Sequence, residues 1–230
     1  MSSPASASTS VSAQRYRDGV RAALAVAATV SFFGASFGLV ARSAGMGMVA
    51  PVVMSATTFA GSAQFAVSSI LGAAGGATSA IAAAVLLNAR YAPISISVAG
   101  LFRGPRLRRL LESQLIVDES WALASRGGGH FDRRLLLGAG LLLYVSWVSG
   151  TAVGVLAGDA LGDPKNLGLD GAFPALFLAL LVPQLRAPRA ALAAAVGGAI
   201  ALVLIPLTPP GTPIVAASVA CLLGMRRSDS

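Results

Sequence analysis

Long apolar segments, separated by short clusters of charged residues, run along most of the chain. Several of them reach the ~20 residues that a helix needs to cross a bilayer. The apolar segments are residues 22–41, 43–89, 135–158, 170–185, 190–205 and 214–225, of which the first three reach that length. This pattern predicts an all-α, polytopic membrane protein with about six or seven hydrophobic helical elements.

The longest apolar segment is divided by glycine. A cluster at residues 72–76 separates an element that ends near Leu71 from one that begins near Thr78. Gly61 lies further upstream and predicts a broken helix around residues 59–64. Such breaks are tolerated in membranes where protein or water satisfies the freed backbone groups, and in transporters they often mark the substrate site.

Polar sequence defines the domain organisation. Residues 1–14 are rich in Ser, Ala and Thr and are predicted to form a disordered tail. Residues 15–227 then form a single integral-membrane domain, interrupted by one long polar connection at residues 103–134. Leucines within residues 110–125 have partial helical spacing, which predicts an amphipathic interfacial helix or a short inserted one.

The charge distribution predicts the topology. Arginines gather at both ends of the chain and in the connection 103–134, whereas the loop 159–170 is net acidic, so we expect a multi-pass membrane protein with cytoplasmic termini. Residues 1–102 must then cross an even number of times, although they contain three apolar elements. Either one element is a re-entrant pair of half-helices, or residues 110–125 also cross.

A faint similarity between residues 36–65 and 151–180 suggests a duplicated unit. Each segment has small residues, a turn and a Pro or Gly before an aromatic residue. Inverted repeats of this kind are common in transporters.

Composition narrows the function. Charged residues make up 11% of the chain, against about 25% in soluble domains, which excludes an ordinary water-soluble enzyme. The net charge of +8 arises at the ends of apolar segments, which indicates contact with membrane lipid and not with nucleic acid. Cys221 is the single cysteine, and neither a P-loop nor a metal or nucleophile constellation occurs. We predict a non-enzyme that uses no cofactor and no metal.

Gly61 and Gln64 are the first candidate substrate-binding residues. Gln64 is an amide in apolar sequence, and a buried amide needs hydrogen-bond partners. In one interpretation Gly61 lets the helix break and expose backbone groups to an amino acid, while Gln64 donates to and accepts from that substrate. In the other, Gln64 makes a contact between helices and Gly61 permits close packing.

Asn88, Arg90 and Tyr91 are the next candidates for substrate binding. Arg90 lies in the middle of an uncharged segment, where an arginine costs roughly 2.5–3.5 kcal/mol and usually faces a cavity or a partner. Three roles are open for Arg90. It could bind a substrate carboxylate or pair with an acidic residue. Alternatively, Pro93 ends the helix and the arginine snorkels to an interface.

Asp118 and Glu119 are candidate coupling or ion-pair residues. Both lie in the polar connection, so a solvated helix face is the alternative. As neighbours on a helix they point in different directions. They are therefore not predicted to be an acid and base pair.

Four motifs in order make the chain resemble the AzlC family, the large subunit of two-component branched-chain amino acid transporters. They are F-A-G-S-A-Q-F at 59–65, N-A-R-Y at 88–91, D-E-S-W-A-L at 118–123 and F-P-A-L-F-L-A-L-L at 173–181. Trp121 stands where the resemblance would place Phe. The resemblance covers roughly residues 15–225.

The resemblance implies an inner-membrane permease that moves Val, Leu or Ile, often outward, with a small hydrophobic partner of the AzlD type. Two other functions stay open on the residues alone. One is the membrane subunit of an ATP-driven complex, docked through residues 103–134. The other is a non-transporting membrane scaffold or a membrane enzyme.

Overall fold

The computed structural model describes residues 4–161, 178, 181–182, 185 and 188–220 of the chain. Every regular element in these ranges is a helix, which confirms the all-α prediction. Among these residues, two helical stretches are long and apolar enough to cross a membrane, Val26–Ser43 and Arg133–Gly158. The bent pair Ala77–Asn88 and Tyr91–Leu101 is a third when its two halves are counted as one span.

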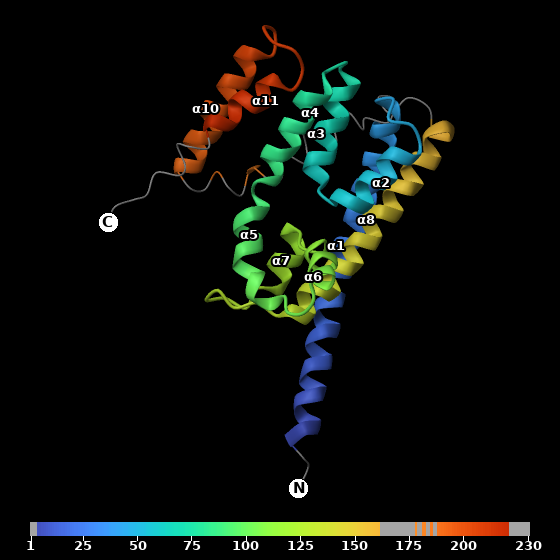
Figure 1. The fold of residues 1–230 in the computed structure, drawn as a ribbon, viewed down its shortest axis with the longest axis vertical. Coiled ribbons are helices and arrows are strands. Elements are labelled where there is room, and N and C mark those ends of the chain that lie inside the picture. The colour runs from blue at the N-terminus through green and yellow to red at the C-terminus, as the bar shows by residue number, and fades with distance from the viewer. Residues whose placement is uncertain (1–3, 162–177, 179–180, 183–184, 186–187, 221–230) are drawn as a thin grey trace.

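Helices α1 (Pro4–Ser43) and α8 (Arg133–Leu161) form the central pair of the fold. They run parallel and side by side (Figure 1). Their contact is built from glycines four residues apart, which are Gly34 and Gly38 on α1 and Gly150, Gly154 and Gly158 on α8. A Cβ atom on Gly34 would lie 2.6 Å from the carbonyl oxygen of Trp147, so the backbones approach as closely as the small residues allow.

Helices α2 (Val49–Thr58) and α3 (Gly61–Gly72) form a re-entrant pair. Ser68 near the end of α3 donates to the sulfur of Met46, 3.5 Å away, and Gly72 lies against Ala44. The pair therefore returns to the end of the molecule from which it started, as Figure 1 shows. This arrangement confirms the predicted break and agrees with the re-entrant alternative for residues 1–102.

The break between α2 and α3 lies at residues 59–60. Phe59 has a left-handed backbone (φ 42°), and the last carbonyls of α2 lose their helical donors there. Side chains replace them: Tyr144 donates to the carbonyl of Ala56 at 2.8 Å, and Gln114 donates to that of Thr57 at 2.8 Å. The break is stable in an apolar environment because these backbone groups are satisfied.

A second break separates α4 (Ala77–Asn88) from α5 (Tyr91–Val98), which continues into the short 3-10 helix η1 (Ala99–Leu101). The two halves are bent by 40°. Pro93 explains the bend, since its ring nitrogen cannot donate to the preceding turn and its ring disfavours a continuous helix. Arg90 stands at this break.

The polar connection folds into two short helices at the lower end of the molecule, α6 (Arg106–Ser113) and α7 (Asp118–Ala124). Neither is long enough to cross a bilayer. Glu112 of α6 accepts from Arg108 at 2.8 Å and pairs with Arg133 at the start of α8. These two hydrogen bonds hold the pKa of Glu112 below its usual value.

The ends of the chain differ in detail from the prediction. Helix α1 begins at Pro4, so residues 4–14 are helical where the sequence predicts a disordered tail; no glycine or further proline interrupts them. Helix α10 (Pro188–Leu204) corresponds to the predicted segment 190–205. Helix α11 (Thr212–Ala217) and the 3-10 helix η4 (Ser218–Ala220) begin the last segment.

Some predictions fall on sequence that the structure does not describe. The segment 170–185, the acidic loop 159–170 and the second half of the suggested duplicated unit lie largely outside the described residues.

Candidate functional site

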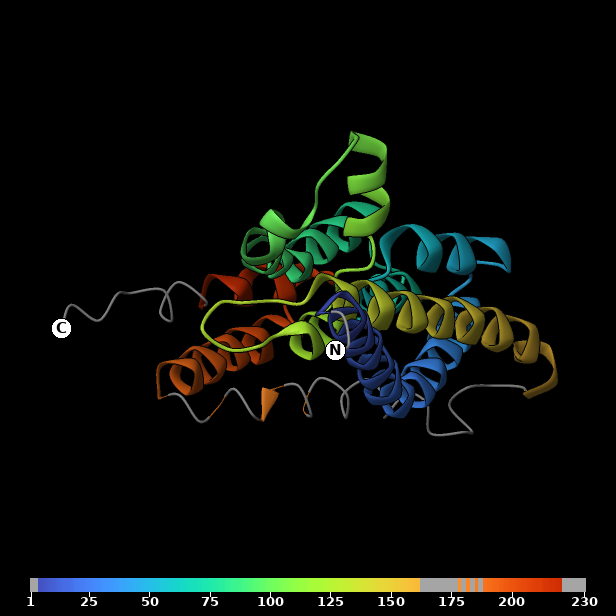
Figure 2. The ribbon, with the colours of Figure 1, turned by 90° about the horizontal axis from the view of Figure 1, so that it is seen from below.

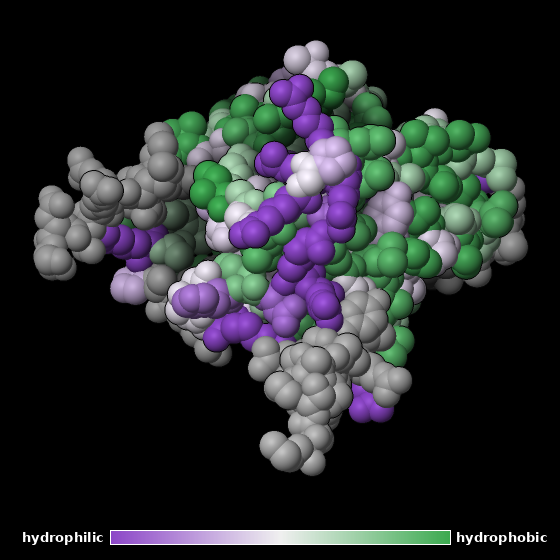
Figure 3. Space-filling model, turned by 60° about the horizontal axis from the view of Figure 1, so that its bottom comes forward, coloured by the Kyte–Doolittle hydropathy of each residue, from purple (hydrophilic) through white to green (hydrophobic). Residues whose placement is uncertain are grey.

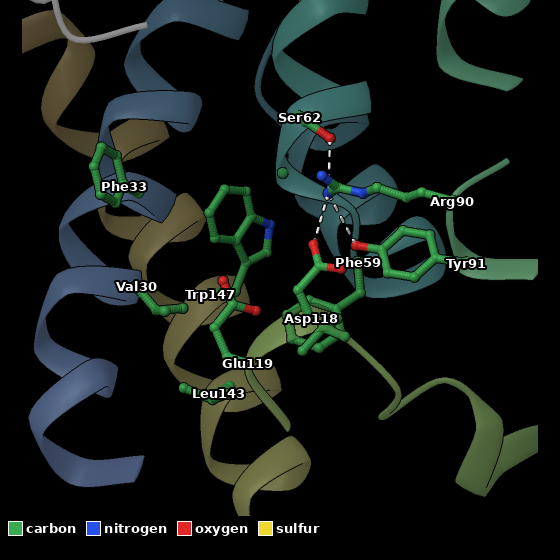
Figure 4. Close-up of a pocket in the computed structure, with 12 residues that line it drawn as sticks. Val30, Phe33, Phe59, Ser62, Arg90, Tyr91, Asp118, Glu119, Leu143 and Trp147 are labelled. Atoms are coloured by element: carbon green, nitrogen blue, oxygen red, sulfur yellow. Dashed lines mark hydrogen bonds and ion pairs between the residues drawn. The ribbon is translucent and has the colours of Figure 1, made fainter. Parts of the chain in front are cut away.

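A small pocket lies where the two helix breaks meet the central pair (Figure 4). Its volume is about 100 Å³, well below the ~300–1,000 Å³ of pockets for drug-sized ligands. It is lined by Val30, Phe33, Phe59, Gly61, Ser62, Arg90, Tyr91, Val117, Asp118, Glu119, Leu143 and Trp147. Trp147 and Leu143 belong to the middle of the apolar segment Arg133–Gly158, so the pocket lies at mid-depth of that span.

Arg90 forms the charged end of the pocket. Its Nη2 atom lies 3.0 Å from Asp118 Oδ2 and donates to Ser62 Oγ at 3.1 Å. It also approaches Tyr91, with 3.4 Å to the hydroxyl and 5.2 Å from Cζ to the ring centroid. The pair between Arg90 and Asp118 realises one of the three predicted alternatives, and the side chains remain 37% and 39% exposed.

The opposite walls of the pocket are apolar. Val30 and Phe33 of α1 face Leu143 and Trp147 of α8, and Phe59 comes from the break between α2 and α3 (Figure 4). Trp147 stacks on Phe37 with ring centroids 6.2 Å apart. The pocket thus has one ionic end and one hydrophobic end.

Gln64 lies behind this pocket and does not line it. Its side chain is completely buried, with Nε2 donating to Ser55 Oγ at 2.9 Å. Its Oε1 accepts from the indole nitrogen of Trp147 at 3.0 Å and from the backbone N–H of Ala60 at 3.2 Å. Gln64 therefore joins the break to α8, which is the contact between helices that the sequence left as an alternative.

Gly61 lines the pocket at the first position of α3. A Cβ atom there would lie 2.8 Å from Cη2 of Trp147. The glycine therefore leaves room for the indole ring beside the break. Asn88, the last residue of α4, is not among the lining residues, and its Oδ1 atom is buried without a hydrogen-bond partner among the described residues.

Glu119 brings a second carboxyl group to the pocket. The residue is exposed to the pocket space, and no described cation pairs with it. The protein around the pocket nevertheless displaces bulk water, and this burial raises the pKa of Glu119. The negative charge of Asp118 acts in the same direction, and Arg90 opposes it.

Seven of the lining residues were missed by sequence reasoning, and two of them, Trp147 and Ser62, hydrogen-bond to predicted site residues. Two signals could have found Trp147. The glycines at 34 and 38 and at 150, 154 and 158 have the spacing of closely packed membrane helices, which would have placed α1 against α8. The indole N–H within an apolar segment also needs a hydrogen-bond partner.

The fold and the pocket define a helical membrane protein with a small site beside the middle of α8. Residues 25–161 match the AzlC protein family, and because the match covers more than half of the chain, the chain belongs to the AzlC family. The predicted resemblance is thereby confirmed. Family membership supports a role in membrane transport.

Three relatives extend this finding. A membrane protein of Archaeoglobus fulgidus, named as uncharacterized, is 33% identical over 194 residues, covering 80% of this chain and 82% of the relative. The branched-chain amino acid transport protein AzlC of Bacillus subtilis is 28% identical over 156 residues, 66% of this chain and 61% of that protein. An uncharacterized membrane protein of Helicobacter pylori is 24% identical over 156 residues, 66% of this chain and 68% of the relative. No solved structure matches the chain.

Proposed function

We propose that the chain is a permease for branched-chain amino acids and that the pocket is its substrate site. One observation supports this most directly: a half-buried guanidinium lies at one end of a small pocket whose opposite walls are apolar. Valine, leucine and isoleucine carry a carboxylate, an ammonium group and an aliphatic side chain, which match these features. The name of the Bacillus relative agrees with the same substrates.

Substrate binding exchanges one set of charge pairs for another. The substrate carboxylate takes the place of Asp118 on the planar fork of Arg90, which suits bidentate binding. Asp118, once released, and Glu119 receive the ammonium group. Arg90 and Asp118 each keep a charged partner in the empty and the occupied pocket, and this matters because an unpaired charge in apolar surroundings costs several kcal/mol.

The remaining residues orient these groups. Ser62 and Tyr91 hold Arg90, and Gly61 admits the indole of Trp147, against which the aliphatic side chain packs. Gln64 acts through Trp147 and the backbone of the break. Asn88, directly before the second break, contributes an acceptor that becomes accessible when α4 and α5 change their angle.

Both breaks border the pocket, so small rotations of the half-helices suffice for alternating access. We assign outward transport and an AzlD-type partner on the family resemblance. Asp118 and Glu119 are the candidate coupling residues: protonation of one carboxyl group changes the charge that faces Arg90.

The test is uptake and efflux of radiolabelled valine in proteoliposomes, with and without the small partner. Arg90→Lys keeps the charge but loses the fork, so flux per folded molecule should fall roughly tenfold or more. Arg134→Lys, an exposed arginine at the start of α8, is the matched control and should transport normally. Native flux in both Arg90→Lys and Arg90→Gln would contradict the assignment of the pocket.

The same vesicles distinguish the alternative functions. We expect the rate of valine flux to depend on an imposed ion gradient and not to change when ATP is added. A strict requirement for ATP and a nucleotide-binding partner would instead indicate a subunit of an ATP-driven complex. Absence of flux for every amino acid tested would favour a scaffold.

A further inference from the structure

Helix α6 lies at the edge of the bundle when the molecule is seen from below (Figure 2). An open groove of about 350 Å³ separates it from α5. Ala99, Phe102, Leu110 and Ile116 form its apolar surface, and Arg106 and Arg109 border it with their guanidinium groups. The groove is distinct from the mid-depth pocket, since the two share no lining residue.

The arginines of α6 are not equivalent. Arg108 is paired with Glu112, with 2.8 Å between Nε and Oε1. Arg106 and Arg109 have no acidic partner among the described residues, and both are exposed. The groove therefore carries two uncompensated positive charges above an apolar floor.

The apolar side of α6 is itself uncovered. Leu107, Leu110 and Leu111 are 70%, 67% and 66% exposed. Figure 3 shows that hydrophilic side chains at this end of the molecule form a band with hydrophobic surface on both sides. A basic helix with exposed leucines lies at the boundary between headgroups and acyl chains of a bilayer.

We propose that the groove between α5 and α6 binds an anionic phospholipid. Arg106 and Arg109 bind the headgroup phosphate with charge-assisted hydrogen bonds, and the acyl chains follow Phe102 and Leu110 into the bilayer. Charge complementarity identifies this occupant, because a zwitterionic headgroup leaves the net charge of the two arginines uncompensated.

The site has a structural consequence for α7. Gln114 at the end of α6 is anchored to the carbonyl of Thr57, and α7 begins four residues later with Asp118. A lipid that holds α6 against α5 therefore also restrains the segment that presents Asp118 to Arg90. The binding site itself does not depend on what the pocket transports.

The experiment measures lipid retention by the purified full chain with native mass spectrometry. The probes are phosphatidylglycerol and phosphatidylcholine with the same acyl chains. Phosphatidylglycerol should bind the native chain more tightly, and Arg106→Gln/Arg109→Gln should lose roughly tenfold to thirtyfold of that preference, since each arginine near an anionic lipid contributes about 1 kcal/mol.

Arg126→Gln/Arg134→Gln is the control, because it removes the same charge from residues outside the groove. It should retain the preference for phosphatidylglycerol. Equal loss in both double variants would show a general charge effect and overturn the site, as would full retention in Arg106→Gln/Arg109→Gln. Displacement of the lipid by millimolar inorganic phosphate would also overturn it, because it would indicate a site for a soluble anion.

Discussion

Trp147 is the residue through which the buried polar groups reach the pocket. Its ring forms part of the apolar wall, while its indole nitrogen donates to Gln64 at 3.0 Å. Gln64 in turn donates to the hydroxyl of Ser55, and that oxygen lies 2.8 Å from the hydroxyl oxygen of Thr151 on α8. A polar network of this kind is stable only when its members are satisfied, so its residues should act as a unit.

Replacement of Gln64 tests this unit. Gln64→Leu leaves the indole N–H and the backbone N–H of Ala60 without their acceptor, which should destabilise the protein by about 1–3 kcal/mol. Trp147→Phe removes the indole donor together with part of the ring. A double-mutant cycle, measured by unfolding in mixed micelles, should give a coupling energy of about 0.5–3 kcal/mol between the two positions. Additive effects would separate Gln64 from Trp147.

Glu119 should make stability depend on pH. Burial raises the pKa of its carboxyl group, so the folded protein holds this proton more tightly than the unfolded chain does. The resulting stabilisation is complete below the ordinary pKa of about 4.3 and is lost as the pH rises through the raised value. The melting temperature, measured between about pH 4 and pH 8, should therefore change less with pH for Glu119→Gln than for the native chain. Identical slopes would contradict the raised pKa.

At the scale of elements, glycines determine which helices come together. The contact of α1 with α8 leaves no room for a side chain at Gly34, where a Cβ atom would lie 2.6 Å from a backbone carbonyl oxygen. Because this oxygen belongs to the backbone, it cannot move aside as the end of a flexible side chain could. The two helix breaks have other causes. Pro93 disfavours a continuous helix through α4 and α5. At the break between α2 and α3, Tyr144 and Gln114 donate hydrogen bonds to the free carbonyls at the end of α2.

Gly34→Ala should therefore separate α1 from α8 and lower the melting temperature in detergent markedly. Gly198 provides the matched control: it lies within α10, and a Cβ atom there would meet no atom within 4 Å. Gly198→Ala should be neutral or should stabilise the protein by about 0.5–1 kcal/mol through helix propensity. Equal melting temperatures for the two variants would exclude close packing at Gly34.

At the scale of the whole molecule, the re-entrant pair lets the chain reach the polar connection on the side where α1 began. Helices α2 and α3 descend from one end and return to it, and α4 to η1 then cross to the other end (Figure 1). Residues that follow α4 along the chain, in α5 and in the polar connection, form the groove. Residues of the same two segments also contribute to the charged end of the pocket.

Single cysteines test this path. Met48→Cys before α2 and Ala73→Cys after α3 are both exposed positions and should react with an impermeant thiol reagent from the same side of the membrane. Ser113→Cys in α6 should react from the opposite side. Each change is made in a Cys221→Ala background. Labelling of Met48→Cys and Ala73→Cys from opposite sides would mean that the chain crosses between them.

Local sequence was sufficient for the class of protein and for the position of the first break. Apolar segment length, the glycines at 61 and 72–76 and the isolated Arg90 act through backbone geometry and desolvation, which depend on near neighbours in the chain. The helix break at residues 59–60, the end of α3 and the start of α4 accordingly lie where the pattern predicts them.

Only the tertiary structure decided which polar groups meet. Arg90 had three possible roles on sequence, and its contact with Asp118 depends on α7 folding back against two helix breaks. Gln64 faces Trp147 across 83 positions of the chain because glycines bring α8 against α1 and the re-entrant pair. Contacts between distant segments depend on how the whole bundle packs, and the glycine spacing indicates only the pairing of α1 with α8. Span length and helix breaks, in contrast, are set mainly by residues adjacent in sequence.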